Sequence, residues 1–343
     1  MFDTFILSLF AHGYKVKPST LFHLLKGKRS SSVLVYGFFY QSLQYVGLFP
    51  KLSEEKYNQL LKDFFQKRYL AHFGEEVKIT ELGLKQVEHF PKGLTSHIDN
   101  YHFARGEEKI WRLFLFSIQV VSEFTHQERK YLPIENTPFY TTLVKRWFAT
   151  MNKENFSEKF KEELIFLLDR VEIETANELA LQFTGHARNG LIYQQMDKEE
   201  LFLQTLKHKN QLHELFKIMV ENVAHIPLLW ALLGNVFKQN HNLSMNQTKN
   251  LLINGNSLAE VSEKRGIKPS TVADHLLELA LVEENFDFQL KLPTEVQNFF
   301  AITTNEETII SLRYSELNQK YPLEFVEFRL AQIAWIRRQR HGR

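Results

Sequence analysis

The residues best suited to bind a charged partner form a basic segment near the N-terminus. No acidic residue occurs from Thr4 to Ser53, and the segment KGKRSSS at residues 26–32 places three cations around Gly27 and three serines at a predicted helix start. Lysine, arginine and the N–H groups of a helix N-terminus all bind phosphate. The candidate contacts to a DNA backbone are Lys15, Lys17, Lys26, Lys28 and Arg29. The alternative is a solvated basic loop that caps a helix.

A second group of cations lies at the C-terminal end of the chain. The last predicted helix ends in a basic tail that includes Arg337, Arg338 and Arg340. Such a tail either adds sequence-independent attraction to nucleic acid or is merely solvated. These three arginines are therefore further candidate DNA contacts.

Residues 254–279 predict a helix, a tight turn and a second helix. Ser257 and Glu260 have the S-x-x-E spacing of a capping box, which starts a helix. Gly266 suits a sharp turn because it has no Cβ, and Pro269 suits the first turn of the next helix. We therefore predict a helix-turn-helix unit. The positions expected to be buried in its second helix are Val272, Leu276 and Leu279, and those expected to be exposed are Ser270, Thr271, Ala273, Asp274 and Leu277.

The charge of this unit leaves its role open. In proteins that read DNA, the N-terminal part of the second helix meets base edges, which makes Ser270 and Thr271 candidate DNA contacts. That helix also carries Asp274 and Glu278 but no Lys or Arg, and residues 244–285 hold four Lys or Arg against six Asp or Glu. Such a segment is a poor electrostatic match for a duplex. A role in protein contact or packing is at least as well supported as base reading.

The acidic residues and the closing helix supply candidate contacts to a protein partner. The closing helix has more large apolar groups than one face can bury in a small domain, and tryptophan is enriched at interface hot spots. The candidate protein contacts are Asp274, Glu278, Glu283 and Trp335. In the alternative, these apolar groups all pack internally against the middle of the chain.

Helix signals dominate the pattern, so the sequence predicts a mainly α protein with three domains. The first, residues 1–95, is expected to be winged-helix-like, with a two-stranded wing that turns near residues 73–76. A plain helical domain with one small hairpin is the alternative. A helical middle domain at residues 96–240 and a helix-turn-helix domain at residues 241–343 follow.

Several kinds of chemistry have no signature in this sequence. There is no Cys, which excludes disulfides and thiolate metal sites and fits a reducing cytosol. No P-loop and no H-E-x-x-H motif occurs, so we predict no enzyme, no cofactor and no metal site. The two most apolar runs, residues 110–121 and 226–237, are shorter than the roughly 20 residues that span a bilayer. We expect a cytoplasmic protein without membrane contact.

The motifs described above also carry a family resemblance. The segment SLAEVSEKRGIKPSTVADHLLELA at residues 257–280 resembles the helix-turn-helix module that ends some RecQ-type helicases and the bacterial YpbB-like proteins. The segment YPLEFVEFRLAQIAW is similar to the closing helix of that module, and LLKGKRSSSVL and GLFPKLS are similar to the start of YpbB-like proteins. The resemblance implies a non-enzymatic protein that acts beside a RecQ-type helicase in DNA repair or recombination.

Three hypotheses follow. The first is an adaptor that binds a RecQ-type helicase, DNA through phosphate contacts, or both. The second is a transcription regulator, which should dimerise and prefer one DNA site. The third is a structural interaction protein without nucleic-acid contact. An adaptor should bind DNA weakly, with strong salt dependence and without sequence preference.

Overall fold

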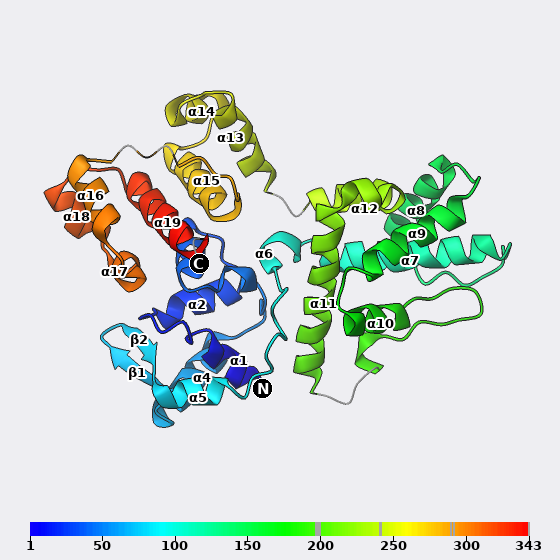
Figure 1. Ribbon diagram of the computed structural model, residues 1–343, viewed down its shortest axis with the longest axis horizontal. Coiled ribbons are helices and arrows are strands. Elements are labelled where there is room, and N and C mark those ends of the chain that lie inside the picture. The colour runs from blue at the N-terminus through cyan, green and yellow to red at the C-terminus, as the bar shows by residue number, and fades with distance from the viewer. Residues whose placement is uncertain (196–199, 240–241, 289, 291, 342–343) are drawn as a thin grey trace. The chain divides into compact units, whose positions relative to one another are not determined.

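The computed structural model describes residues 1–195, 200–239, 242–288, 290 and 292–341 (Figure 1). Helices dominate these residues, which confirms the prediction of a mainly α protein. The chain forms two compact units, one of residues 1–2 and 90–241 and the other of residues 3–89 and 242–343. The sequence predicted three consecutive domains, whereas here the N-terminal and C-terminal segments share one unit.

The first unit is a helical domain with an aromatic core. Its core includes Phe114, Phe216 and Leu233, which are fully buried. Pro227 begins a helix instead of interrupting one, because its missing N–H is tolerated in the first turn. The helices of this unit are α6 (Asn100–Phe103), α7 (Glu107–Thr125), α8 (Pro138–Thr150), α9 (Phe156–Leu168), α10 (Ile173–Leu181), α11 (Leu201–Glu221) and α12 (Pro227–Lys238), with short 3-10 helices η2 (Tyr193–Gln195) and η3 (Val223–His225).

Buried polar groups in this unit are satisfied internally. The Glu163 carboxylate accepts hydrogen bonds from the backbone N–H groups of Leu228 and Leu229, both at 2.8 Å, and so caps the start of α12 from α9. Nδ1 of the fully buried His213 accepts from the Asp99 N–H at 2.8 Å, so its Nε2 carries the proton and donates to Glu107 at 2.7 Å. These contacts join separate elements of the unit, so we assign them a structural role.

The N-terminal part of the second unit contains the predicted hairpin. Strands β1 (Leu70–Phe73) and β2 (Glu76–Ile79) pair antiparallel, and Gly74 in their turn has a φ of +68°. Val16 forms an isolated bridge to the middle of β2, with backbone hydrogen bonds of 2.9 and 2.8 Å to Val77. The hairpin turns where the sequence predicted it, while the winged-helix assignment stays a prediction. The helices here are α1 (Phe2–Ser8), α2 (Pro18–Leu25), α3 (Ser31–Phe39), α4 (Glu54–Gln66) and α5 (Glu81–Val87), with a 3-10 helix η1 (Leu43–Tyr45).

The C-terminal part of the second unit carries the helix-turn-helix. In Figure 1 its yellow-to-red helices lie together with the blue N-terminal helices, and α15 packs on both α3 and α19. The helices are α13 (Leu243–Ile253), α14 (Leu258–Arg265), α15 (Pro269–Val282), α16 (Thr294–Ile302), α17 (Glu306–Ser311), α18 (Tyr314–Lys320) and α19 (Phe325–His341).

Among the described residues, no helix combines the length and the apolar character that crossing a bilayer requires.

Candidate nucleic-acid interface

The local geometry of the helix-turn-helix follows its sequence. Ser257 Oγ accepts from the N–H of Glu260, and the Glu260 carboxylate accepts from the N–H of Ser257 at 2.7 Å, which completes the predicted capping box. Gly266 ends α14 with a φ of +62°, in the left-handed region that favours glycine. Pro269 opens α15, and Val272 is fully buried beneath it. The predicted unit of two helices and a tight turn is therefore present.

The outward surface of α15 is smaller than the sequence predicted. Ser270 and Asp274 are exposed, and Thr271 and Ala273 are partly exposed. Leu277, expected on the outside, is only 2% exposed, whereas Leu276, expected to be buried, is partly exposed. The inward face is therefore rotated relative to the prediction, because α15 packs on α3 and α19 as well as on α13 and α14. The surface of α15 that is open to a partner is therefore its N-terminal half.

One ion pair joins two groups that the sequence assigned to different partners. Arg29 Nη2 donates to Glu278 Oε1 at 2.7 Å, and the Glu278 side chain is only 9% exposed. Arg29 was a candidate DNA contact and Glu278 a candidate protein contact. The prediction that Glu278 belongs to an exposed acidic face is therefore wrong, because its carboxylate holds α15 to the start of α3.

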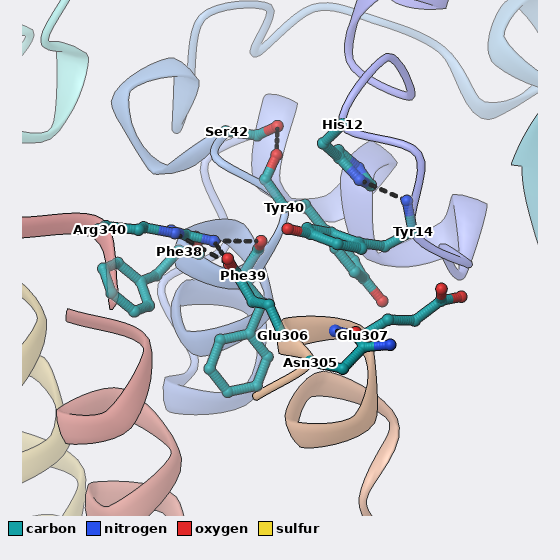
Figure 2. Close-up of polar contacts among 10 residues, drawn as sticks. All are labelled: His12, Tyr14, Phe38, Phe39, Tyr40, Ser42, Asn305, Glu306, Glu307 and Arg340. Carbon is teal, nitrogen blue, oxygen red and sulfur yellow. Dashed lines mark hydrogen bonds and ion pairs between the residues drawn. The ribbon is translucent and has the colours of Figure 1, made fainter. Parts of the chain in front are cut away.

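Two arginines of the predicted basic tail hold helix ends inside the second unit. Arg337 donates to the carbonyls of Ala280, Glu283 and Glu284 at 2.6–2.9 Å, which satisfies the last turn of α15. Arg340 donates in the same way to the carbonyls of Phe38 and Phe39 at the end of α3, and it pairs with Glu306 at 2.5 Å (Figure 2). Arg338 is exposed. The basic tail is thus the last part of α19, and of its three candidate arginines Arg338 alone is exposed.

The closing helix is also more deeply packed than a docking surface would be. Trp335 is 5% exposed, so its proposed role as an interface anchor is not supported by its position. Its neighbours Phe328, Ile333 and Ile336 are fully buried, whereas Phe325 is exposed. The helix packs on α15 and α17 within its own unit.

The other candidate residues differ in whether they form ion pairs within the chain. Lys17 pairs with Glu75 at 3.2 Å, and Glu283 pairs with Lys249 at 2.7 Å. Lys15 is exposed and lies over the Phe73 ring.

Lys26 and Lys28 are exposed in the turn between α2 and α3. At the centre of that turn, Gly27 has a φ of +91° and lies against the backbone of Gly47, with no room to spare for a side chain. Within the described part of the chain, neither lysine forms an ion pair with a carboxylate. The two ammonium groups are therefore presented to solvent on a turn of fixed shape.

The Arg29–Glu278 pair brings this basic turn next to α15. Glu278 lies one helical turn beyond Asp274 and two beyond Ser270, about 6 and 12 Å along the axis. The basic turn and the open half of α15 therefore belong to one side of the second unit. We call the surface formed by Lys26, Lys28, Ser270 and Thr271 the basic-turn surface.

Sequence reasoning did not identify a cavity on the same unit. Its walls include Tyr14, Tyr36 and Tyr40 from the N-terminal segment and Arg313 and Arg329 from the C-terminal segment. The one sequence signal was that Tyr36 and Tyr40 follow the basic segment one helical turn apart. The arginines lie more than 250 residues further along the sequence, Arg313 just before α18 and Arg329 in α19, so no local pattern links them to those tyrosines.

Comparison with known proteins agrees with the helix-turn-helix geometry. A family model described as a helix-turn-helix domain matches residues 244–332. The chain is also 25% identical over 279 residues to Protein YpbB of Bacillus subtilis (strain 168), which covers 78% of each chain. No solved structure matches it. The chain is thus similar to YpbB over most of its length and carries a C-terminal segment that matches a helix-turn-helix domain.

Proposed function

We propose that this chain is a non-catalytic accessory protein that binds duplex DNA through phosphate contacts of the basic-turn surface and acts beside a RecQ-type helicase in DNA repair or recombination. The helix-turn-helix domain and the similarity to YpbB indicate a DNA-binding regulatory or accessory protein. The proposed partnership with a RecQ-type helicase and the role in DNA repair or recombination rest on the family resemblance of the sequence.

One observation carries the DNA-binding part of this proposal. The ion pair between Arg29 and Glu278 joins the turn that carries exposed Lys26 and Lys28 to α15, two helical turns from Ser270 in its open half. It also neutralises the buried Glu278 carboxylate. A helix-turn-helix whose own helices lack sufficient cations thereby gains phosphate-binding groups from the N-terminal segment.

The same geometry favours sequence-indifferent binding over operator reading. The open positions of α15 are short or acidic side chains, and the exposed carboxylate at Asp274 is repelled by phosphate unless it accepts from a cytosine amino group. Few base contacts are therefore available, while the lysines supply contacts that carry no sequence information. A transcription regulator remains the second candidate because the helix-turn-helix itself is complete.

The first prediction tests the basic-turn surface. We expect the double substitution Lys26→Ala with Lys28→Ala to weaken binding of random duplex DNA by about fivefold or more. The slope of log K against log salt should fall by up to about 0.9 per lost phosphate contact. Fluorescence anisotropy of a labelled 20-base-pair duplex at several salt concentrations measures both quantities.

The matched control is Lys62→Ala with Lys67→Ala, which removes two exposed lysines on and just after α4. This variant should bind duplex almost as well as the unaltered protein. Equal losses in the two variants would contradict a localised surface. A loss of sequence preference on Ser270→Ala with Thr271→Ala would favour the transcription-regulator alternative.

A further inference from the structure

A cavity of about 820 Å³ lies within the second unit, between the N-terminal segment and the helices α17 to α19. Figure 2 shows residues of both walls, with Tyr14 and Tyr40 from the N-terminal segment and Asn305 and Glu307 from the C-terminal segment. The walls are rich in tyrosine and in charged side chains. We call this cavity the tyrosine groove.

The aromatic wall is held in a fixed arrangement. Tyr14 stacks on His12 with ring centroids 5.0 Å apart, and His12 stacks on Tyr40 at 5.4 Å with the two planes 7° apart. The N–H of Tyr14 donates to His12 Nδ1 at 3.0 Å (Figure 2). Burial lowers the pKa of His12 to about 4, so the stack is uncharged at neutral pH. Tyr40 is only 2% exposed, so it is the partly exposed Tyr14 ring, supported from below by this stack, that an unpaired base can reach.

The opposite wall adds a second aromatic and cationic layer. Arg329 lies 5.2 Å from the centre of the Tyr36 ring, and its Nη1 donates to Gln332 at 2.7 Å, which fixes the plane of the guanidinium. Tyr314 is held by a hydrogen bond from its hydroxyl to the Leu323 carbonyl at 2.9 Å. Arginine and tyrosine planes of this kind stack on bases irrespective of sequence.

The charges of the groove favour phosphate once its ion pairs are counted. Of the three carboxylates, Glu75 pairs with Lys17 at 3.2 Å and Glu307 pairs with Lys78 at 3.7 Å. Three cations then face a single further carboxylate, Glu76. These cations are Lys15, Arg313 and Arg329. Arg313 Nε lies 4.0 Å from Glu316 Oε1, but the two side chains are 75% and 67% exposed, so this pair is weak in water and a backbone phosphate can compete for Arg313.

The remaining carboxylate fits the same ligand. Among the residues that the structure describes, Glu76 makes no ion pair. A carboxylate is an acceptor, and the amino groups of cytosine, adenine and guanine are donors. In a duplex these groups are paired and stacked inside the helix, so only unpaired bases can enter a groove of this size. Thymine has no amino group and would lack this contact.

We propose that the tyrosine groove binds a short single-stranded segment of DNA, with unpaired bases against its tyrosines and the adjoining phosphates on Lys15, Arg313 and Arg329. This inference rests on the proposed DNA-binding function. It adds a second site, which binds single-stranded DNA, to the basic-turn surface, which binds duplex DNA. The groove and the basic-turn surface share no residue, which allows the two sites to be tested separately.

The test uses the full chain and labelled oligonucleotides of 12 cytosines or 12 thymines, with a 20-base-pair duplex alongside, in fluorescence anisotropy. We expect Lys15→Ala with Arg313→Ala to weaken binding of the cytosine strand about tenfold and to change duplex binding less than twofold. Both side chains are exposed, so the fold should be kept. The control Lys62→Ala with Lys67→Ala should change neither.

The two sites separate in the remaining variants. Lys26→Ala with Lys28→Ala should weaken duplex binding and leave binding of the cytosine strand nearly unchanged. If this variant binds duplex as well as the unaltered protein does, the proposed role of the basic-turn surface is wrong, whereas the single-strand site in the groove is not affected by that result. Glu76→Gln should reduce the preference for cytosine over thymine. Equal binding of the cytosine strand by the Lys15/Arg313 variant and the unaltered protein, or no binding of any single strand, would overturn the groove.

A photochemical readout locates the strand directly. A 12-residue oligonucleotide with one 5-iodo-deoxyuridine should cross-link on irradiation to peptides that contain Tyr14 or Tyr314, because aromatic side chains that stack on the halogenated base are the favoured partners. If the cross-linked peptides all came from outside the groove, the assignment of the single-strand site would be contradicted. If an added peptide displaced the labelled oligonucleotide and unlabelled single-stranded DNA did not, the groove would be a protein-binding site and the proposal would be overturned.

Discussion

At the scale of single residues, the most informative feature is that charged side chains predicted to meet partners mostly meet other parts of the same chain. Arg29, Arg337 and Arg340 each bind a group on a neighbouring helix. A hydrogen-bonded arginine at a helix C-terminus satisfies carbonyls that would otherwise lack partners. These residues therefore contribute to stability, and the exposed lysines are better placed for DNA.

His12 gives a prediction that depends on pH. Its pKa is lowered to about 4 by burial, and secondarily by the nearby charge of Arg340, against an ordinary value of 6.5. Between these values the unfolded chain binds a proton that the folded chain excludes, so the free energy of unfolding falls as the pH is lowered. The contribution is fully present above about pH 6.5 and lost toward pH 4.

We expect the unaltered protein to lose about 1–2 kcal/mol of stability between pH 7 and pH 5 through this residue. In His12→Phe, which keeps an aromatic ring between Tyr14 and Tyr40, the loss over this pH range should be smaller by about that amount. Urea unfolding at both pH values measures the difference. Identical pH dependence in the two proteins would contradict the role of His12.

At the scale of elements, the decisive contact is between α3 and α15. Leu277, Glu278 and Leu279 in the C-terminal half of α15 are buried, whereas Ser270 and Asp274 in its N-terminal half are exposed. The Arg29–Glu278 pair lies at one end of this contact, with side chains that are 23% and 9% exposed. Removing one member of a pair that is largely withdrawn from water leaves an uncompensated charge.

We therefore expect Glu278→Ala to lower the free energy of unfolding by about 1–3 kcal/mol. The double variant Arg29→Ala with Glu278→Ala should lose less than the sum of the two single losses, because the stranded charge is removed as well. The control is Glu158→Ala at the exposed pair with Lys161, which should cost within about 1 kcal/mol. Additive losses at Arg29 and Glu278 in urea unfolding would show that the pair is not coupled.

At the scale of the whole molecule, the N-terminal and C-terminal segments fold into one unit and the middle of the chain forms another. The helix-turn-helix is thus part of a unit that needs residues from both ends of the sequence. Its capping box and turn are local, but its second helix is covered by α3 and its closing helix is anchored to the end of α3 by Arg340. Binding measurements consequently require the full chain.

The prediction at this scale concerns the RecQ-type helicase. Asp274 is exposed on the open half of α15, and an exposed carboxylate attracts a basic partner surface mainly through the association rate. We expect Asp274→Lys to slow association with a nuclease-treated RecQ-type helicase by about twofold or more at low salt. The effect should shrink at high salt because surface charges are screened.

Surface plasmon resonance at two salt concentrations tests this prediction, with Glu55→Lys on the exposed face of α4 as the matched control. Absence of helicase binding by the unaltered protein would end this part of the proposal. Slower association in both variants would indicate a general charge effect. Stronger DNA binding by Asp274→Lys is expected in either case, since a repulsive group next to the basic turn has become attractive.

The sequence by itself determined the elements whose causes lie within a few residues. The capping box needs only Ser257 and Glu260, the turn needs a glycine at position 266, and the hairpin needs a turn near Gly74. The structure confirms each of these because the hydrogen bonds and backbone angles involved are local. The missing P-loop could likewise be read directly from the sequence.

Only the tertiary structure decided which charges remain available to a partner. Arg29 and Glu278 are 249 positions apart, and Arg340 reaches the end of α3 across about 300 residues. Hydrophobic periodicity predicts that a helix has a buried face, but it does not say which distant helix covers that face or which side chain there matches a charge. For the same reason the tyrosine groove, built from both ends of the chain, could not be predicted from sequence spacing.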